Sequence, residues 1–86
     1  MNHPDFRIAG KIFATLGYPD GEHGMVKLTP EQQRVFVKKA PSVFSASVGL
    51  WGKKGSTSIY LRSATIDLIG TALDVASKNI IVKLKA

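Results

Sequence analysis

The chain has 86 residues, which is enough for one domain over residues 1–86 with a single core and too short for two. Its composition, 44% hydrophobic and 21% charged, excludes a mostly disordered protein, and the lack of cysteine excludes disulfides, thiolate catalysis and cysteine-based zinc sites. No apolar run reaches the ~20 residues of a membrane span, and the first residues do not resemble a signal peptide, so we expect a cytoplasmic protein without membrane contact.

The charge of the chain is strongly positive. Twelve basic residues against six acidic ones give a net charge of +6 and an isoelectric point near 9.9. Such an excess favours an anionic partner such as nucleic acid. Many small basic domains bind none, so the placement of the charges matters more than their number.

The first third of the chain predicts a curled antiparallel sheet. Residues 6–8 and 11–16 flank Ala9-Gly10, which predicts a tight hairpin because glycine tolerates a positive φ. Apolar residues alternate along the second of these segments, as expected for a strand with one buried face. Residues 17–24 are rich in glycine and proline and predict a loop, and residues 25–28 predict a third strand.

A helix start is the sharpest local signal in the sequence. Thr29 is a good N-cap, Pro30 suits the first helical position, and Gln32 stands where a capping box needs it. The helix is expected to continue to about residue 39 or 40, before Pro41, with two side chains facing the sheet: Val35 and Phe36.

The second half predicts another hairpin and another helix. Residues 43–48 and 56–62 are expected to pair across a connection rich in glycine and lysine. Ser63 or Thr65 then caps a helix that stops near Asn79. Its predicted buried stripe comprises Ile66, Ile69, Ala72, Leu73 and Ala76. Residues 80–86 alternate apolar residues with lysines and predict a short edge strand or an ordered arm.

Three segments of the chain resemble a known family. The strings HPDFR, GKIFATLGYPD and GMVKLTPEQQ, followed by a glycine-tryptophan-glycine turn with basic residues, are similar to the MmcQ/YjbR-like family over nearly the whole length. The resemblance implies an α+β fold like that of CyaY, with a curled antiparallel sheet and helices on one face. It also implies DNA binding through a "double wing" arrangement, a role that is itself inferred from shape.

The chain departs from this family at its start. Members usually carry an additional helix before the HPDFR segment, whereas this sequence begins two residues before His3. We expect the family's N-terminal helix to be absent and the apolar surface it would cover to be open to a partner or a second copy. A homodimer is therefore a further expectation.

Alternation predicts a basic open face on the sheet. With Ile12, Leu28, Ile59 and Leu61 toward the core, the opposite face would carry Arg7, Lys11, Phe13, Lys27, Tyr60 and Arg62. Basic side chains neutralise phosphates and aromatic rings stack on exposed bases. The alternative is an ordinary solvated face, on which Phe13, Met25 and Tyr60 pack beneath a helix or a partner.

The turn at residues 52–55 is a second candidate contact. Lys53 and Lys54 could follow a phosphate backbone, and Trp51 could stack beside them. The alternative is a solvated turn that uses lysine to discourage edge pairing, with Trp51 buried beneath it.

Catalytic and metal chemistry find little support. His23 lies in a loop with Asp20 and Glu22 but lacks the ligand spacing of a metal site. We therefore expect no catalytic residue, no metal and no cofactor. The sequence predicts a non-enzymatic protein that binds nucleic acid, DNA rather than RNA, with little sequence selectivity. The alternative is a non-catalytic protein-interaction module, including a homodimer.

Overall fold

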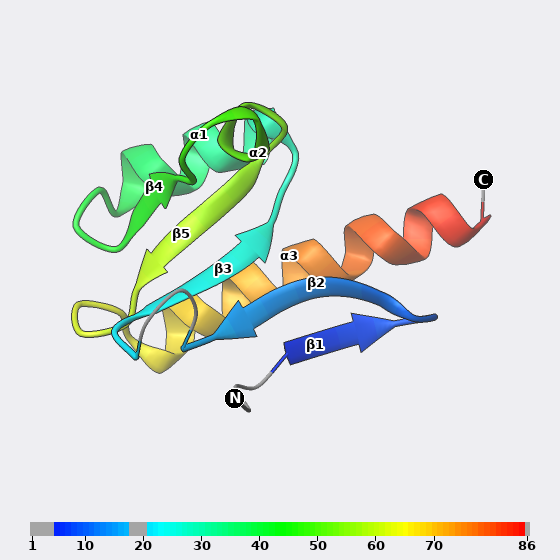
Figure 1. Cartoon of the computed structure of the whole chain (residues 1–86), viewed down its shortest axis with the longest axis horizontal. Coiled ribbons are helices and arrows are strands. Elements are labelled where there is room, and N and C mark those ends of the chain that lie inside the picture. The colour runs from blue at the N-terminus through cyan, green and yellow to red at the C-terminus, as the bar shows by residue number, and fades with distance from the viewer. Residues whose placement is uncertain (1–4, 18–20, 86) are drawn as a thin grey trace.

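The computed structural model describes residues 5–17 and 21–85, so residues 18–20 of the predicted loop lie outside the described residues (Figure 1). The strands form one antiparallel sheet in the order β1-β2-β3-β5-β4. The strands are β1 (Asp5–Ile8), β2 (Lys11–Leu16), β3 (His23–Lys27), β4 (Phe44–Ala46) and β5 (Ser56–Tyr60), and the helices are α1 (Pro30–Lys39), α2 (Leu50–Lys53) and α3 (Ile66–Lys85).

The two longer helices lie on the same face of the sheet, behind it in the view of Figure 1. Helix α1 packs on β4 and β5, and α3 packs on β1, β2 and β3. Between these helices and the sheet lies the core, whose largest fully buried side chains are Phe44, Ile59, Val26 and Thr57. The predicted α+β class, with helices packed on one face of an antiparallel sheet, is confirmed, and neither α1 nor α3 lies on the opposite face, which we call the open face.

The β1–β2 hairpin contains a bulge that the sequence did not predict. Its turn is the predicted one, with positive φ at Ala9 (52°) and Gly10 (79°). Phe6 lies opposite Ala14 and Arg7 opposite Ile12, so the register skips Phe13. The skip interrupts the alternation of β2, and Phe13 enters the core, 8% exposed, with its ring 6.2 Å from that of Phe6. The predictions that Phe13 is on the open face and available for stacking are wrong.

Helix α1 begins as its sequence predicts. The backbone N–H of Gln32 donates to Thr29 Oγ1 at 3.2 Å, and the N–H of Thr29 donates to Gln32 Oε1 at 2.9 Å, which completes a capping box. Phe36 is buried against Phe44, with ring centroids 5.1 Å apart. Val35, predicted to face the sheet, is 64% exposed, and Val37 packs against the core instead.

Helix α3 is longer than predicted. It is capped by Thr65, whose Oγ1 accepts from the N–H of Leu68 at 3.1 Å, and it continues through Asn79 to Lys85. The predicted stop at Asn79 and the predicted edge strand or arm are wrong. The Asn79 side chain instead exchanges two hydrogen bonds with Gln32 of α1, of 2.8 and 3.1 Å, and Ile80 enters the core one residue later.

The predicted second hairpin is present with shorter strands. Strands β4 and β5 pair antiparallel, but β4 covers only Phe44–Ala46 and β5 ends at Tyr60. Their connection contains α2 rather than a simple turn. Strand β3 begins two residues earlier than predicted, at His23. Within the described ranges, no helix has both the length and the apolar character needed to cross a membrane.

Candidate nucleic-acid interface

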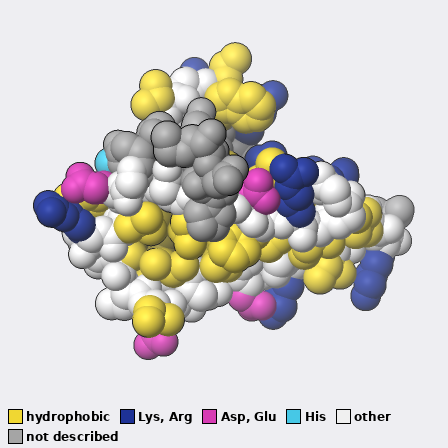
Figure 2. Space-filling view, turned by 60° about the horizontal axis from the view of Figure 1, so that its bottom comes forward, with side chains coloured by type: hydrophobic (Ala, Val, Ile, Leu, Met, Phe, Trp, Pro, Cys, Tyr) yellow, Lys and Arg dark blue, Asp and Glu magenta, His cyan; other side chains and the backbone are white. Residues whose placement is uncertain are grey.

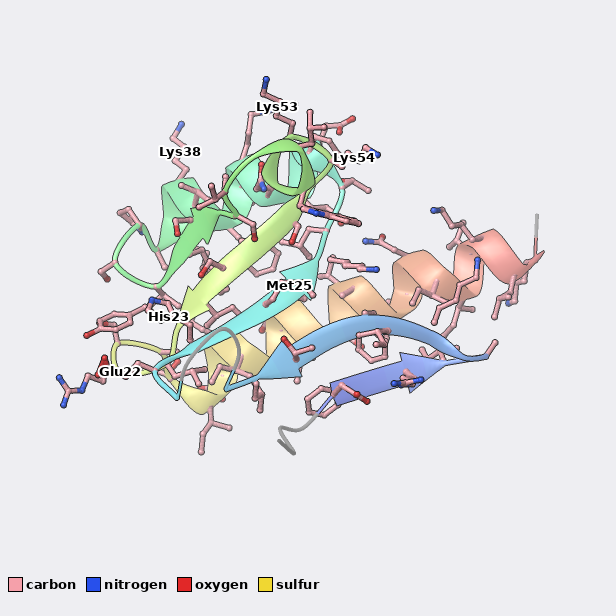
Figure 3. All side chains as sticks on the ribbon, in the orientation of Figure 1. Glu22, His23, Met25, Lys38, Lys53 and Lys54 are labelled. Carbon is pink, nitrogen blue, oxygen red and sulfur yellow. The ribbon has the colours of Figure 1, made fainter. Side chains whose placement is uncertain are left out.

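The open face of the sheet carries a row of side chains that crosses four strands. The cross-strand pairs Thr15–Met25, Met25–Ser58 and Ser58–Ser45 place these residues side by side. Met25 lies near the middle of this face in Figure 3. The row is apolar at Met25 and bears hydroxyls on both sides, so the surface suits a flat, partly polar molecule better than a simple ion.

A groove runs over this row toward α2. We call it the hydroxyl groove, because five of its lining residues carry hydroxyls: Thr15, Ser45, Ser47, Ser56 and Ser58. Its other principal walls are Ile12, Met25, Lys27 and Trp51. Ile12, predicted to face the core, thus lines the open side because of the bulge in β2.

A second depression adjoins this groove, between the sheet, α2 and the end of α3. We call it the lysine hollow, because four lysines from different parts of the chain line it: Lys11, Lys27, Lys54 and Lys83. None of the described residues that line it carries a carboxylate. Four lysines in the lining of one depression, together with apolar residues such as Ile80, favour an anionic ligand.

The positions of these lysines follow from local structure. Lys11 opens β2 directly after the β1–β2 turn, and Lys27 closes β3 opposite Ser56. Lys54 is the C-cap of α2. Lys83 stands four residues after Asn79, on the same side of α3, so the helical extension of the tail brings it to the hollow.

Helix α2 is held in place from both sides. The side-chain amide of Gln33 in α1 donates to the carbonyl oxygens of Gly52 and Ser56, each at 2.9 Å. On the other side, a Cβ atom at Gly52 would overlap the carbonyl oxygen of Ser47, so only glycine fits this approach. A short helix that is tightly seated in this way holds Trp51 and Lys54 in fixed positions.

Trp51 lies at the junction of the two depressions. It lines both of them, and it is 66% exposed. The alternative in which Trp51 is buried beneath a solvated turn is therefore wrong. An exposed indole between a cationic site and an apolar one can stack on a base or a sugar.

The structure divides the predicted binding residues into two groups. Four of them line the lysine hollow: Lys11, Lys27, Trp51 and Lys54. The other four line neither depression: Arg7, Lys53, Tyr60 and Arg62. Figure 3 shows Lys53 pointing away from the sheet at the outer end of α2, while Lys54 points toward the side where α3 ends.

Three of the four outlying predicted residues have partners of their own. Arg7 Nε lies 3.2 Å from Asp5 Oδ1, and Arg62 Nε lies 3.5 Å from Glu22 Oε2. The Tyr60 ring packs 5.4 Å from that of His23. These pairings offset positive charge at the far ends of the sheet. The predicted contacts of Arg7, Tyr60 and Arg62 with nucleic acid stay predictions.

Two parts of the site were missed in the sequence. Lys83 was hidden because residues 80–86 read as alternating extended chain, although Ala76, Asn79, Ile80 and Lys83 also fit helical spacing. The serines of β4 and β5 were visible as outward-facing positions, but serine alone carries no signal for a binding site.

In the part of the chain that the structure describes, no three His, Asp or Glu side chains gather closely enough to hold a metal ion. Comparison of the chain with protein families, with curated proteins and with solved structures finds no match.

Proposed function

We propose that this protein is a non-enzymatic nucleic-acid-binding domain that holds the phosphate backbone in the lysine hollow. The observation that supports this most is the convergence of Lys11, Lys27, Lys54 and Lys83, from separate parts of the chain, on one depression whose described lining residues include no carboxylate. Lysine ammoniums bind phosphates as point charges and release the counterions condensed there.

The proposed contacts go to phosphate and therefore carry little sequence selectivity. Phosphate contacts position a protein on nucleic acid, whereas sequence is read at base edges. We propose DNA rather than RNA, in agreement with what the family resemblance implies. Asn79, the one amide among the described residues that line the hollow, already bonds Gln32 through its side chain and is not free to read a base edge.

The test is a titration of the purified protein into fluorescently labelled single-stranded and duplex DNA, followed by anisotropy at two salt concentrations. We expect micromolar binding that weakens steeply as salt rises, because bound phosphates exchange counterions for lysines. A chain of net charge +6 that binds neither probe at low salt would contradict the proposal.

A second candidate function is a protein contact, including a homodimer. Figure 2 shows a band of hydrophobic side chains along α3. On this helix Ile66 is 88% exposed, Val82 66% and Leu84 52%. Exposed apolar bands of this kind often mark protein interfaces. None of these three residues lines the lysine hollow, so the two functions are compatible.

A further inference from the structure

The hydroxyl groove contains a buried polar atom that the lysine hollow does not use. Thr15 is only 7% exposed, and its Oγ1 has no hydrogen-bond partner in the described part of the chain. Buried hydroxyls in folded proteins nearly always have a partner. Thr15 lines the groove but its Oγ1 is shielded from solvent, so a bound molecule supplies the missing partner once the side chains over Oγ1 move aside.

The other hydroxyls nearby show how unusual Thr15 is. Thr57 is fully buried, and its Oγ1 donates to the carbonyl oxygen of Gly55 at 2.9 Å. Ser47 and Ser56, at the α2 end of the groove, share a hydrogen bond of 3.0 Å between their hydroxyls. The hydroxyls of Thr57, Ser47 and Ser56 are therefore paired within the fold, while that of Thr15 is not.

The groove and the hollow form one continuous surface. Ile12, Lys27, Trp51 and Ser56 line both of them. If Lys27 binds a phosphate, the sugar and base of the same nucleotide lie next to Trp51 and the groove. A strand whose phosphates lie in the hollow can therefore place a base in the adjoining groove.

We propose that the hydroxyl groove receives an unpaired base of single-stranded DNA whose backbone lies in the lysine hollow. This inference rests on the proposed function and names the form of nucleic acid that the site takes. Met25, Ile12 and Trp51 offer apolar and aromatic surface for the faces of the base. Hydroxyls both donate and accept, so Thr15 and Ser58 can serve any base.

A duplex fits this surface poorly. Its bases are stacked and paired, so they reach a groove on a flat sheet only after they are unstacked and flipped out. The hydroxyl groove lies on the sheet beside the cationic hollow, which is the arrangement that single-strand binders use for stacking and phosphate contacts.

The test compares three labelled probes of equal length. They are an oligothymidylate of about 12 nucleotides, a strand of abasic sites with the same phosphates, and a duplex. The unmodified protein is expected to bind the oligothymidylate at least about tenfold more tightly than the abasic strand, because only the former has bases to stack. It is also expected to bind the duplex more weakly than the oligothymidylate.

Two threonine variants separate binding from folding. Thr15→Val removes a hydroxyl without a partner, so thermal stability is expected to be retained while affinity for oligothymidylate falls about three- to tenfold. Thr57→Val is the matched control. It removes the hydrogen bond to Gly55 on the core side and lowers stability, but it leaves the ratio of the affinities for the oligothymidylate and the abasic strand unchanged. Neither variant is expected to change binding of the abasic strand.

The outcomes distinguish the two proposals. Equal affinity for the oligothymidylate and the abasic strand would overturn the base site, and so would equal affinity for the oligothymidylate and the duplex. Either result would leave phosphate binding intact. Unchanged oligothymidylate affinity in Thr15→Val would overturn the base site as well. Thymidine 5′-monophosphate is also tested as a competitor of the labelled oligothymidylate. If it competes as strongly as the unlabelled strand at equal nucleotide concentration, the groove is assigned to a free nucleotide instead. Failure of all three probes to bind would overturn the proposed function itself.

Discussion

At the scale of single residues, the site depends on a few side chains that combine exposure with a fixed position. Trp51 is the clearest example, since its indole is 66% exposed yet stands on a helix anchored by Gln33. A large aromatic side chain left open to solvent gains little for folding. Its exposure beside four lysines is more readily explained by a ligand.

Trp51→Ala is therefore expected to separate binding from stability. The free energy of unfolding should change by less than about 0.5 kcal/mol, as for other exposed positions, while DNA binding loses about 1–3 kcal/mol of base stacking. Thermal melts and anisotropy titrations measure the two quantities. Leu50→Ala is the control, because Leu50 is 70% exposed on the same helix but lines neither depression. Equal losses of affinity in both variants would contradict the role given to Trp51.

The two neighbouring lysines at the end of α2 are expected to behave differently. Lys54→Ala removes a charge from the lysine hollow and should weaken DNA binding and lower the salt slope by about one. Lys53→Ala removes a charge that points away from the lysine hollow, so affinity should change little (Figure 3). Anisotropy titrations of both variants decide this, and identical losses would contradict the assignment of Lys54 to the hollow.

At the scale of elements, α2 determines the geometry of the site because its backbone at Gly52 lies directly against that of Ser47. Glycine within a helix normally costs stability relative to alanine. At Gly52, in contrast, alanine would be less stable than glycine, since a methyl group would overlap the carbonyl oxygen of Ser47. The element that carries Trp51 and precedes Lys54 thus depends on a position without a side chain.

Gly52→Ala is expected to destabilise the protein by about 2 kcal/mol or more, because the overlap is with backbone. Gly70→Ala in α3 is the matched control. A Cβ there meets nothing within 4 Å, so alanine should stabilise the fold by about 0.5–1 kcal/mol through helix propensity alone. Urea unfolding measures both, and a stabilising effect at both positions would show that α2 is not closely packed against Ser47.

Elements determined by local chemistry could be predicted from the sequence. Helix α1 follows from Thr29, Pro30 and Gln32 within one turn, and the first hairpin follows from Ala9-Gly10. The bulge at Phe13 could not be predicted, because it depends on how β1 pairs with β2 and leaves no local mark. The end of α3 was also missed, since Asn79 is a common stop signal and its contact with Gln32 is long-range.

At the scale of the whole molecule, the fold brings distant charges together. Lys11 and Lys83 are separated by most of the sequence but line the same depression. Alternation along single strands could place Lys11 and Lys27 on the open face, yet it could not place Lys83, which reaches the hollow only through the length of α3. Of the predicted residues that line the hollow, Lys11 and Lys27 follow from strand alternation, and Trp51 and Lys54 follow from the glycine- and lysine-rich connection.

The apolar band on α3 predicts self-association. We expect light scattering across a concentration series to give a mass above the 9.3 kDa of one chain. Leu84→Glu should return the protein to the monomer, since it places a charge among exposed apolar side chains near Val82. The control is Lys85→Glu, one residue further along the same helix. A monomer at every concentration would contradict the second candidate function.

The most direct test of the central claim is the salt dependence of DNA binding in two lysine variants at the end of α3. With four lysines on a single strand, log-affinity should fall with log-salt at a slope of about −3. Lys83→Ala should reduce the slope to about −2 and weaken binding, because it removes one of these contacts. Lys85→Ala, which removes an equal charge that lines neither depression, should leave the slope unchanged. Identical slopes for the two variants would show that net charge, rather than the lysine hollow, holds the DNA.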